Sequence, residues 1–272
     1  MTDLGLREVV LPFLPSFFSI VAALVVPAIV GLLIMAGAAR AVSPTYLAAF
    51  ALGLYFWFFS DTIGDSAFLD VNSGFGGGAT QVALVLLFVA GMLFVFSLDR
   101  ETFSGSSLAG GMGFGVPLLL AFAVGVHGFG EGAAFMATAA TTPATGLLDA
   151  FGGISAAVAF VLHKMLEPMM VGAAYWVYAR DHAKNAGGVA RDLLLLALVF
   201  VTPGIVGAAT DYYWLYDTTY FFALGLGTSL YAAVRLAMPL FAPASSKWES
   251  SRIALSVTLG FLCLYFAALL HA

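Results

Sequence analysis

"VPLLLAFAVGVHGFGEGAAFMATA", the stretch Val116–Ala139, is an apolar run that contains two ionisable residues. An α-helix needs about 20 residues to cross the hydrocarbon core of a bilayer, and this run is long enough. His127 and Glu131 lie near its middle. Because an ionisable side chain at that depth costs about 3 kcal/mol when it faces lipid, we expect both residues to face other helices.

The composition of the whole chain points the same way. Of the 272 residues, 62% are hydrophobic and 9% are charged, and the mean hydropathy is +1.02. Soluble domains carry about 25% charged residues, so the composition indicates a polytopic membrane protein. A net charge of −5 and the lack of a basic patch argue against a nucleic-acid partner. Cys263, the one cysteine, excludes an internal disulfide and a cysteine-based zinc site.

Eight apolar runs predict an all-α protein with eight transmembrane helices. The connectors are brief, so residues 1–272 form a single transmembrane domain. The second run is short unless its helix continues through Asp61 and Asp65. The runs are Val9–Ala38, Thr45–Phe59, Ala79–Leu98, Val116–Ala139, Gly153–Tyr178, Leu193–Ala209, Tyr220–Leu240 and Ile253–Leu270.

The basic residues predict the orientation. With eight spans and the N-terminus outside, Arg7 falls on the outer side, Lys164 lies inside a span, and the other basic residues share one side. The positive-inside rule makes that side cytoplasmic and places both termini outside. The residues on that side are Arg40, Arg100, Arg180, Lys184, Arg191, Arg235, Lys247 and Arg252.

A second His–Glu pair lies in the fifth run, in "LHKMLEP", Leu162–Pro168. Residues four apart share a helix face, so His163 and Glu167 point the same way, as do His127 and Glu131. If the two helices are antiparallel neighbours, His127 is level with Glu167 and Glu131 with His163. The four side chains then form a box near mid-membrane. This nitrogen-and-oxygen set suits Zn²⁺, Fe²⁺, Mn²⁺ or Co²⁺; the alternative is two ion pairs that only hold the spans together.

Residues that disfavour helix flank the box. Gly128, Gly130 and Gly132 surround Glu131, and Pro168 follows Glu167. For the glycines, a broken helix at a transport site and close helix packing through small residues are both open. For Pro168 we expect a functional kink.

The motifs "HGFGEG" and "HKMLEP" resemble those on the fourth and fifth spans of the ZIP (Zrt/Irt-like) family of divalent metal transporters. The resemblance implies an inverted 3+2+3 arrangement of eight helices, both termini outside, a homodimer and a place in the plasma membrane. It also implies a metal site at His127, Glu131, His163 and Glu167.

Three departures from the family pattern affect its second metal site. Gly128 replaces an asparagine, Lys164 replaces an acidic ligand, and Thr202 stands where the sixth span can offer a carboxylate. A single-metal site is therefore implied, with the Lys164 ammonium as a surrogate for the second cation. A buried lysine needs a counter-charge, so we expect a carboxylate within its reach.

The predicted function is uptake of a divalent metal ion, with zinc foremost and iron, manganese or cobalt as alternatives. Asp61 and Asp65 are expected to attract the ion at the outer mouth, unless they form only a solvated turn. We do not expect an enzyme. The alternatives are an intramembrane zinc hydrolase of the ceramidase-like type, a retinal protein with Lys164 as its Schiff base, and a metal-free ZIP-like relic.

Overall fold

The computed structural model describes residues 13–73, 79–99, 113–141, 151, 153–214, 217–237 and 247–268. Within these ranges the chain forms eight α-helices and no strand. The helices are α2 (Phe13–Ala38), α3 (Pro44–Ser73), α4 (Ala79–Leu98), α6 (Gly115–Thr141), α8 (Ile154–Asp181), α9 (Ala186–Asp211), α10 (Thr218–Ala237) and α11 (Lys247–Ala268).

Each predicted apolar run coincides with one of these helices, and three bounds differ by six residues or more. Helix α3 continues well beyond Phe59 and includes Asp61 and Asp65. Helix α9 begins at Ala186 rather than Leu193. The Asn185 side chain caps it by accepting a hydrogen bond of 2.8 Å from the backbone N–H of Gly188. Helix α11 begins at Lys247 rather than Ile253.

The lengths and composition of the helices identify an integral membrane protein. Six helices in the described ranges are long and apolar enough to cross a membrane. The other two, α3 and α4, contain shorter apolar stretches, Pro44–Ser60 and Val82–Leu98. The chain is therefore an all-α, polytopic membrane protein.

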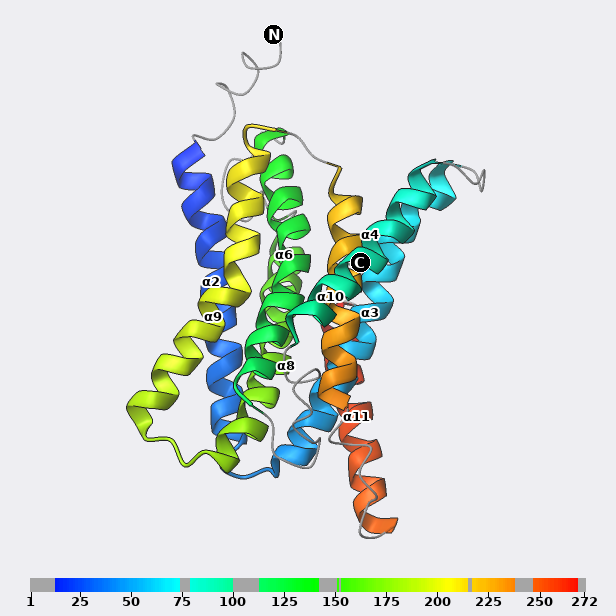
Figure 1. Cartoon of the computed structure of the whole chain (residues 1–272). Helices are drawn as coiled ribbons and strands as arrows, with labels where there is room; N and C mark the ends of the chain where they lie inside the picture. The colour runs from blue at the N-terminus through cyan, green and yellow to red at the C-terminus, as the bar shows by residue number, and fades with distance from the viewer. Residues whose placement is uncertain are drawn as a thin grey trace.

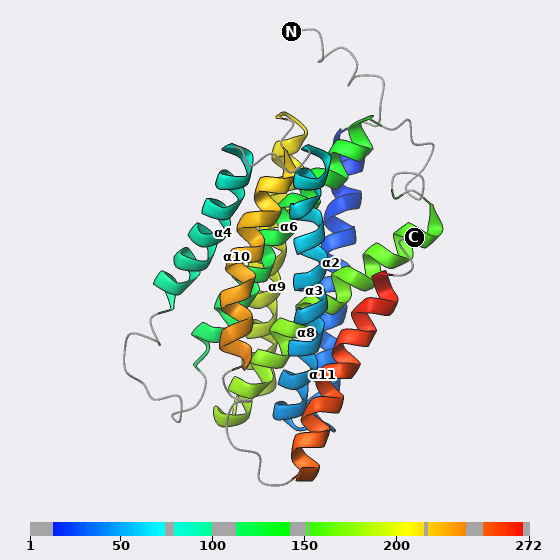
Figure 2. The ribbon, with the colours of Figure 1, turned by 90° about the vertical axis from the view of Figure 1, so that its right-hand side faces the viewer.

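The helices form two groups that lie side by side (Figure 1). Helices α2, α6, α8 and α9 all contact one another and make a four-helix bundle. Helices α4, α10, α3 and α11 follow one another in that order as a helix row (Figure 2). The row packs on the bundle through contacts of α10 with α6 and of α3 with α8.

Glycines allow the closest helix pairs to form. A Cβ on Gly132 of α6 would overlap the carbonyl oxygen of Gly204 on α9, and one on Gly207 of α9 would overlap that of Phe129 on α6. Small residues let membrane helices approach to backbone contact in this way. A Cβ would likewise overlap a carbonyl oxygen of the neighbouring helix at five other glycines, which join α2 to α8, α3 to α11 and α4 to α10. They are Gly31, Gly53, Gly260, Gly91 and Gly227.

Close packing explains two glycines of the fourth span, since a Cβ would come within 2.8 Å of the Phe222 ring at Gly130 and would overlap the Gly204 carbonyl oxygen at Gly132. Helix α6 is continuous through Gly128, Gly130 and Gly132, so these residues do not interrupt it. Helix α8 is likewise continuous through Pro168. The proline ring lies against α2, where a Cβ on Gly31 would come within 3.0 Å of its Cγ atom.

Candidate metal-binding site

Five ionisable side chains meet between α6 and α8, near the middle of both helices. His127 and Glu131 extend from α6, and His163, Lys164 and Glu167 from α8. Four of the five are buried, with exposed fractions of 3% for His127, 7% for His163, 2% for Lys164 and 1% for Glu167. The two helices therefore direct their ionisable groups at each other and away from lipid.

Lys164 joins the two carboxylates. Its ammonium donates hydrogen bonds to Oε2 of Glu131, across the helix interface, and to Oε2 of Glu167 at 2.7 Å on its own helix. The expected carboxylate partner of this buried lysine is thereby confirmed, and there are two. When both imidazoles are neutral, two carboxylates and one ammonium give the cluster one net negative charge.

The second oxygen of each carboxylate faces imidazole. Oε1 of Glu131 lies 3.6 Å from Nε2 of His127 and 4.0 Å from Nε2 of His163. Oε1 of Glu167 lies 2.9 Å from Nε2 of His163, which is hydrogen-bond distance. Each glutamate thus has one oxygen on the lysine and the other on the histidine side.

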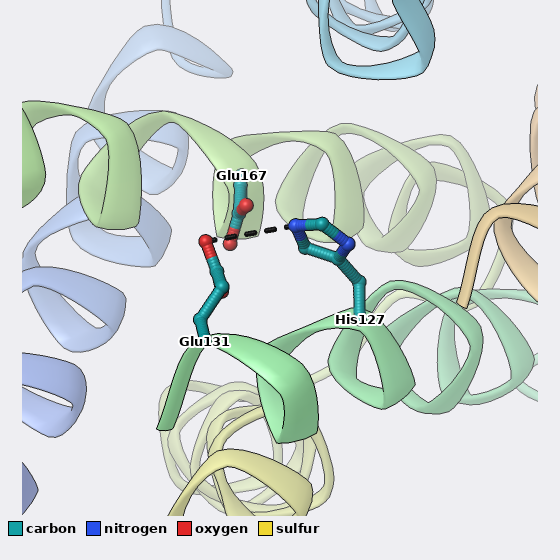
Figure 3. Close-up of side chains that lie close together, drawn as sticks. All are labelled: His127, Glu131 and Glu167. Carbon is teal, nitrogen blue, oxygen red and sulfur yellow. Dashed lines mark ion pairs between the residues drawn. The ribbon is translucent and has the colours of Figure 1, made fainter. Parts of the chain in front are cut away.

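His127, Glu131 and Glu167 form a set that could hold a metal ion. Each offers one ligand atom, and these atoms lie within 4.8 Å of one another. Figure 3 shows the three side chains pointing toward a common point, two from α6 and one from α8. His163 lies beside this set and is bonded to Glu167, so the four predicted ligands are neighbours without being equivalent.

The other residues singled out in the sequence lie elsewhere. Asp61 and Asp65 belong to α3, but their side chains lie outside the described part of the structure, so the proposed outer mouth is not placed. Thr202 is exposed on α9, and its hydroxyl donates to the carbonyl oxygen of Leu198 at 2.6 Å. Gly128 faces the cluster, since a Cβ there would lie 3.8 Å from Oε2 of Glu131.

The sequence did not reveal the aromatic surroundings of His127. The ring of Phe58, on α3, lies 4.7 Å from the imidazole between centroids, and that of Phe222, on α10, lies 5.1 Å from it. Both helices belong to the helix row. Since Phe58 and Phe222 are far from His127 in the chain and phenylalanine is common in it, no local pattern could have singled them out.

Buried aspartates form further ion pairs at the helix ends where basic residues collect. Lys184, in the turn between α8 and α9, pairs with buried Asp192, which also accepts a hydrogen bond from the Tyr175 hydroxyl at 3.3 Å. In the helix row, Nε of Arg235 lies 2.6 Å from Oδ2 of Asp99, joining α10 to α4. These basic residues, predicted only as orientation signals, therefore also hold helix ends together.

Replacing Lys184 by glutamine is expected to lower the melting temperature of the detergent-solubilised protein at neutral pH. The hydrogen bond that the ammonium donates to Asp192 raises the pKa of Lys184 above its ordinary value of 10.5, and a smaller contribution comes from Tyr178. A raised pKa in the folded state stabilises the fold below the ordinary value, and this contribution is lost as the pH rises through the raised value. The difference between wild type and Lys184→Gln should therefore shrink above pH 10.5.

The control is Arg191→Gln, measured by the same thermal unfolding. The Arg191 guanidinium lies 3.7 Å from Asp192, but its side chain is 81% exposed. Exposed ion pairs contribute little, so this change should leave the melting temperature nearly unaltered. An equal loss in both variants would contradict the role given to Lys184.

Comparison of the chain with models of known protein families and with curated proteins found no match. The function is therefore argued from the geometry of the site.

Proposed function

We propose that the protein imports a divalent transition-metal ion, zinc foremost and iron, manganese or cobalt as alternatives, and that it is a divergent member of the ZIP family. The observation that carries this proposal is the donor set of His127, Glu131 and Glu167 near the middle of two apolar helices. Membership of that family would also imply a homodimer in the plasma membrane.

The separation of His127 and Glu131 favours a shared cation over a direct ion pair between these two residues. Nε2 of His127 and Oε1 of Glu131 are 3.6 Å apart, which is too long for a hydrogen bond. Two ligand atoms at about 2.1 Å from a tetrahedral zinc ion lie about 3.4 Å apart. The separation is thus close to what a shared metal ion requires. The uncompensated negative charge of the cluster favours a cation as well.

The position of Lys164 supports a site that binds one metal ion rather than two. Its ammonium holds Oε2 of both Glu131 and Glu167. Those are the oxygens that would otherwise be free to bridge to a second metal ion. The lysine thus supplies a fixed positive charge in place of a second cation. The transported ion is left Oε1 of Glu131 and Oε1 of Glu167, the latter shared with His163.

The pattern of helix contacts supports an inverted 3+2+3 arrangement. In such an arrangement the first repeat maps onto the second, so that α2 corresponds to α9, α3 to α10, α4 to α11 and α6 to α8. The contact of α2 with α8 then becomes that of α9 with α6, and the contact of α3 with α11 becomes that of α10 with α4. Contacts of α6 with α10 and of α8 with α3 exchange as well. Exchanged helices run in opposite directions (Figures 1 and 2), as an inverted repeat requires.

We propose that both termini lie on the outer side of the membrane. Connected helices alternate in direction (Figure 2), so the ends of α2, α8 and α10 lie at the same end of the molecule as the starts of α3, α9 and α11. The basic residues of the described part at these ends make that side cytoplasmic by the positive-inside rule. They are Arg40, Arg180, Lys184, Arg191, Arg235 and Arg252.

Metal uptake into proteoliposomes tests the proposal. Purified wild-type protein should carry Zn²⁺ inward, whereas Glu167→Gln, which removes a ligand, should not. The matched control is Glu249→Gln at the start of α11, which changes a carboxylate far from the site in the chain and should keep uptake. A wild type that binds no ion in isothermal titration would instead support the metal-free relic, and hydrolysis of a lipid amide without uptake would support the zinc hydrolase.

A further inference from the structure

His127 lacks the hydrogen bond that normally orients a metal-binding histidine. Such a histidine usually donates its second ring N–H to a carboxylate, a carbonyl or water, which fixes the ring and its tautomer. Here Nε2 faces Glu131, while Nδ1 is buried and has no hydrogen-bond partner in the described part of the structure. No backbone or side-chain group of the described residues therefore orients the imidazole through Nδ1.

Two phenylalanine rings of the helix row contact that imidazole. Phe58, fully buried on α3, meets it edge to face, with an interplanar angle of 77° and 4.7 Å between centroids. Phe222, on α10, lies at 39° and 5.1 Å. The Phe222 ring also covers Gly130, where a Cβ would come within 2.8 Å of its Cε1 atom. The imidazole is thus confined by rings on two helices outside the four-helix bundle.

The backbone of α10 is held close to α6 at the same level. A Cβ on Gly225 would lie 2.7 Å from Cα of His127, so only glycine fits there without a shift. The Thr228 hydroxyl, one turn further along α10, contacts the carbonyl oxygen of Ala123 at 2.7 Å and that of Gly225 at 2.9 Å. These contacts fix the distance between Phe222 and His127.

We propose that Phe58 and Phe222 are positioning residues for the metal site: by confining the His127 imidazole they direct Nε2 at the ion and set the affinity of the site. This inference rests on the proposed metal binding. Since both rings belong to the helix row and the ligands to the four-helix bundle, metal affinity then depends on how the two groups pack. Any movement that separates the row from the bundle lowers the affinity by freeing the imidazole.

Co²⁺ binding to the purified protein tests this, since its visible absorption reports ligand geometry and its titration reports affinity. In Phe222→Ala we expect an affinity loss of about 10-fold to 100-fold, the usual effect of removing what orients a ligand, and a changed spectrum. Phe222→Tyr, which keeps a six-membered aromatic ring, should retain most of the affinity. The matched control is Phe221→Ala, because the neighbouring ring packs on Phe129 of α6 at 4.3 Å.

The outcomes separate the inference from the proposed function. If wild type and Phe221→Ala bind Co²⁺ alike and Phe222→Ala binds weakly with an altered spectrum, the inference holds. If Phe222→Ala matches wild type in both readouts, the positioning role is wrong while the metal site stands. If wild type itself binds no Co²⁺, Zn²⁺, Fe²⁺ or Mn²⁺, the proposed function fails, and the inference fails with it.

Discussion

Replacing Lys164 by methionine is expected to destabilise the metal-free protein by about 3–5 kcal/mol, the usual cost of removing one partner from a buried ion pair. The ammonium is the counter-charge of both Glu131 and Glu167, and Glu167 is 1% exposed. Without it, two carboxylates face each other in a low-dielectric interior. Methionine has similar length and no charge, so the loss should come from electrostatics rather than from a cavity.

Thermal unfolding with and without Zn²⁺ measures this effect. A divalent ion restores positive charge at the cluster, so Zn²⁺ should stabilise Lys164→Met more than wild type. A ligand at 100 times its dissociation constant contributes about 2.7 kcal/mol. Lys164→Arg, which keeps the charge, serves as the control and should lose less stability. A Lys164→Met variant as stable as wild type without metal would show that the lysine is not the counter-charge of the pair.

Replacing Glu131 by glutamine is expected to lower Zn²⁺ affinity by more than about 100-fold and to abolish uptake, because it removes a metal ligand. Loss of a group that only orients a ligand already lowers metal affinity by up to about 100-fold. Glu131 lies 3.6 Å from His127 and 4.0 Å from His163, so its carboxylate faces both imidazoles. The amide has the same shape but neither the charge nor two acceptor oxygens.

Isothermal titration with Zn²⁺, combined with a melting curve, separates lost binding from lost fold. Lys164 keeps its ion pair with Glu167 at 2.7 Å in this variant, so the protein should still fold. Glu249→Gln is again the control for a carboxylate change outside the site. Wild-type affinity in a folded Glu131→Gln protein would rule out Glu131 as a ligand.

Several features of the site could be predicted from local sequence. The length of the apolar runs predicts the helices because each turn of backbone satisfies its own hydrogen bonds in lipid. The spacing of four residues places His127 beside Glu131 and His163 beside Glu167, since it nearly equals one helical turn. The need of a buried ammonium for a counter-charge predicts a carboxylate near Lys164.

Other features depend on residues far apart in the chain. The brief connector between the fourth and fifth spans suggests that α6 and α8 are main partners, yet the closest backbone contact of α6 is with α9, through Gly132, Gly204 and Gly207. The hydrogen bond of His163 to Oε1 of Glu167, while Lys164 holds Oε2 of both glutamates, depends on how α6 and α8 pack. Neither can be deduced from spacing along one helix.

Local periodicity is enough to predict that the chain forms apolar helices and that two of them carry a histidine and a glutamate on one face, because both are properties of a single helix. The packing of the helices in space sets which carboxylate oxygens meet the lysine and which meet the imidazoles, and it brings Phe58 and Phe222 against His127. The reason is physical: those contacts depend on how helices distant in sequence pack, and glycine positions and ring shapes set that packing through many small contacts rather than through any one pattern.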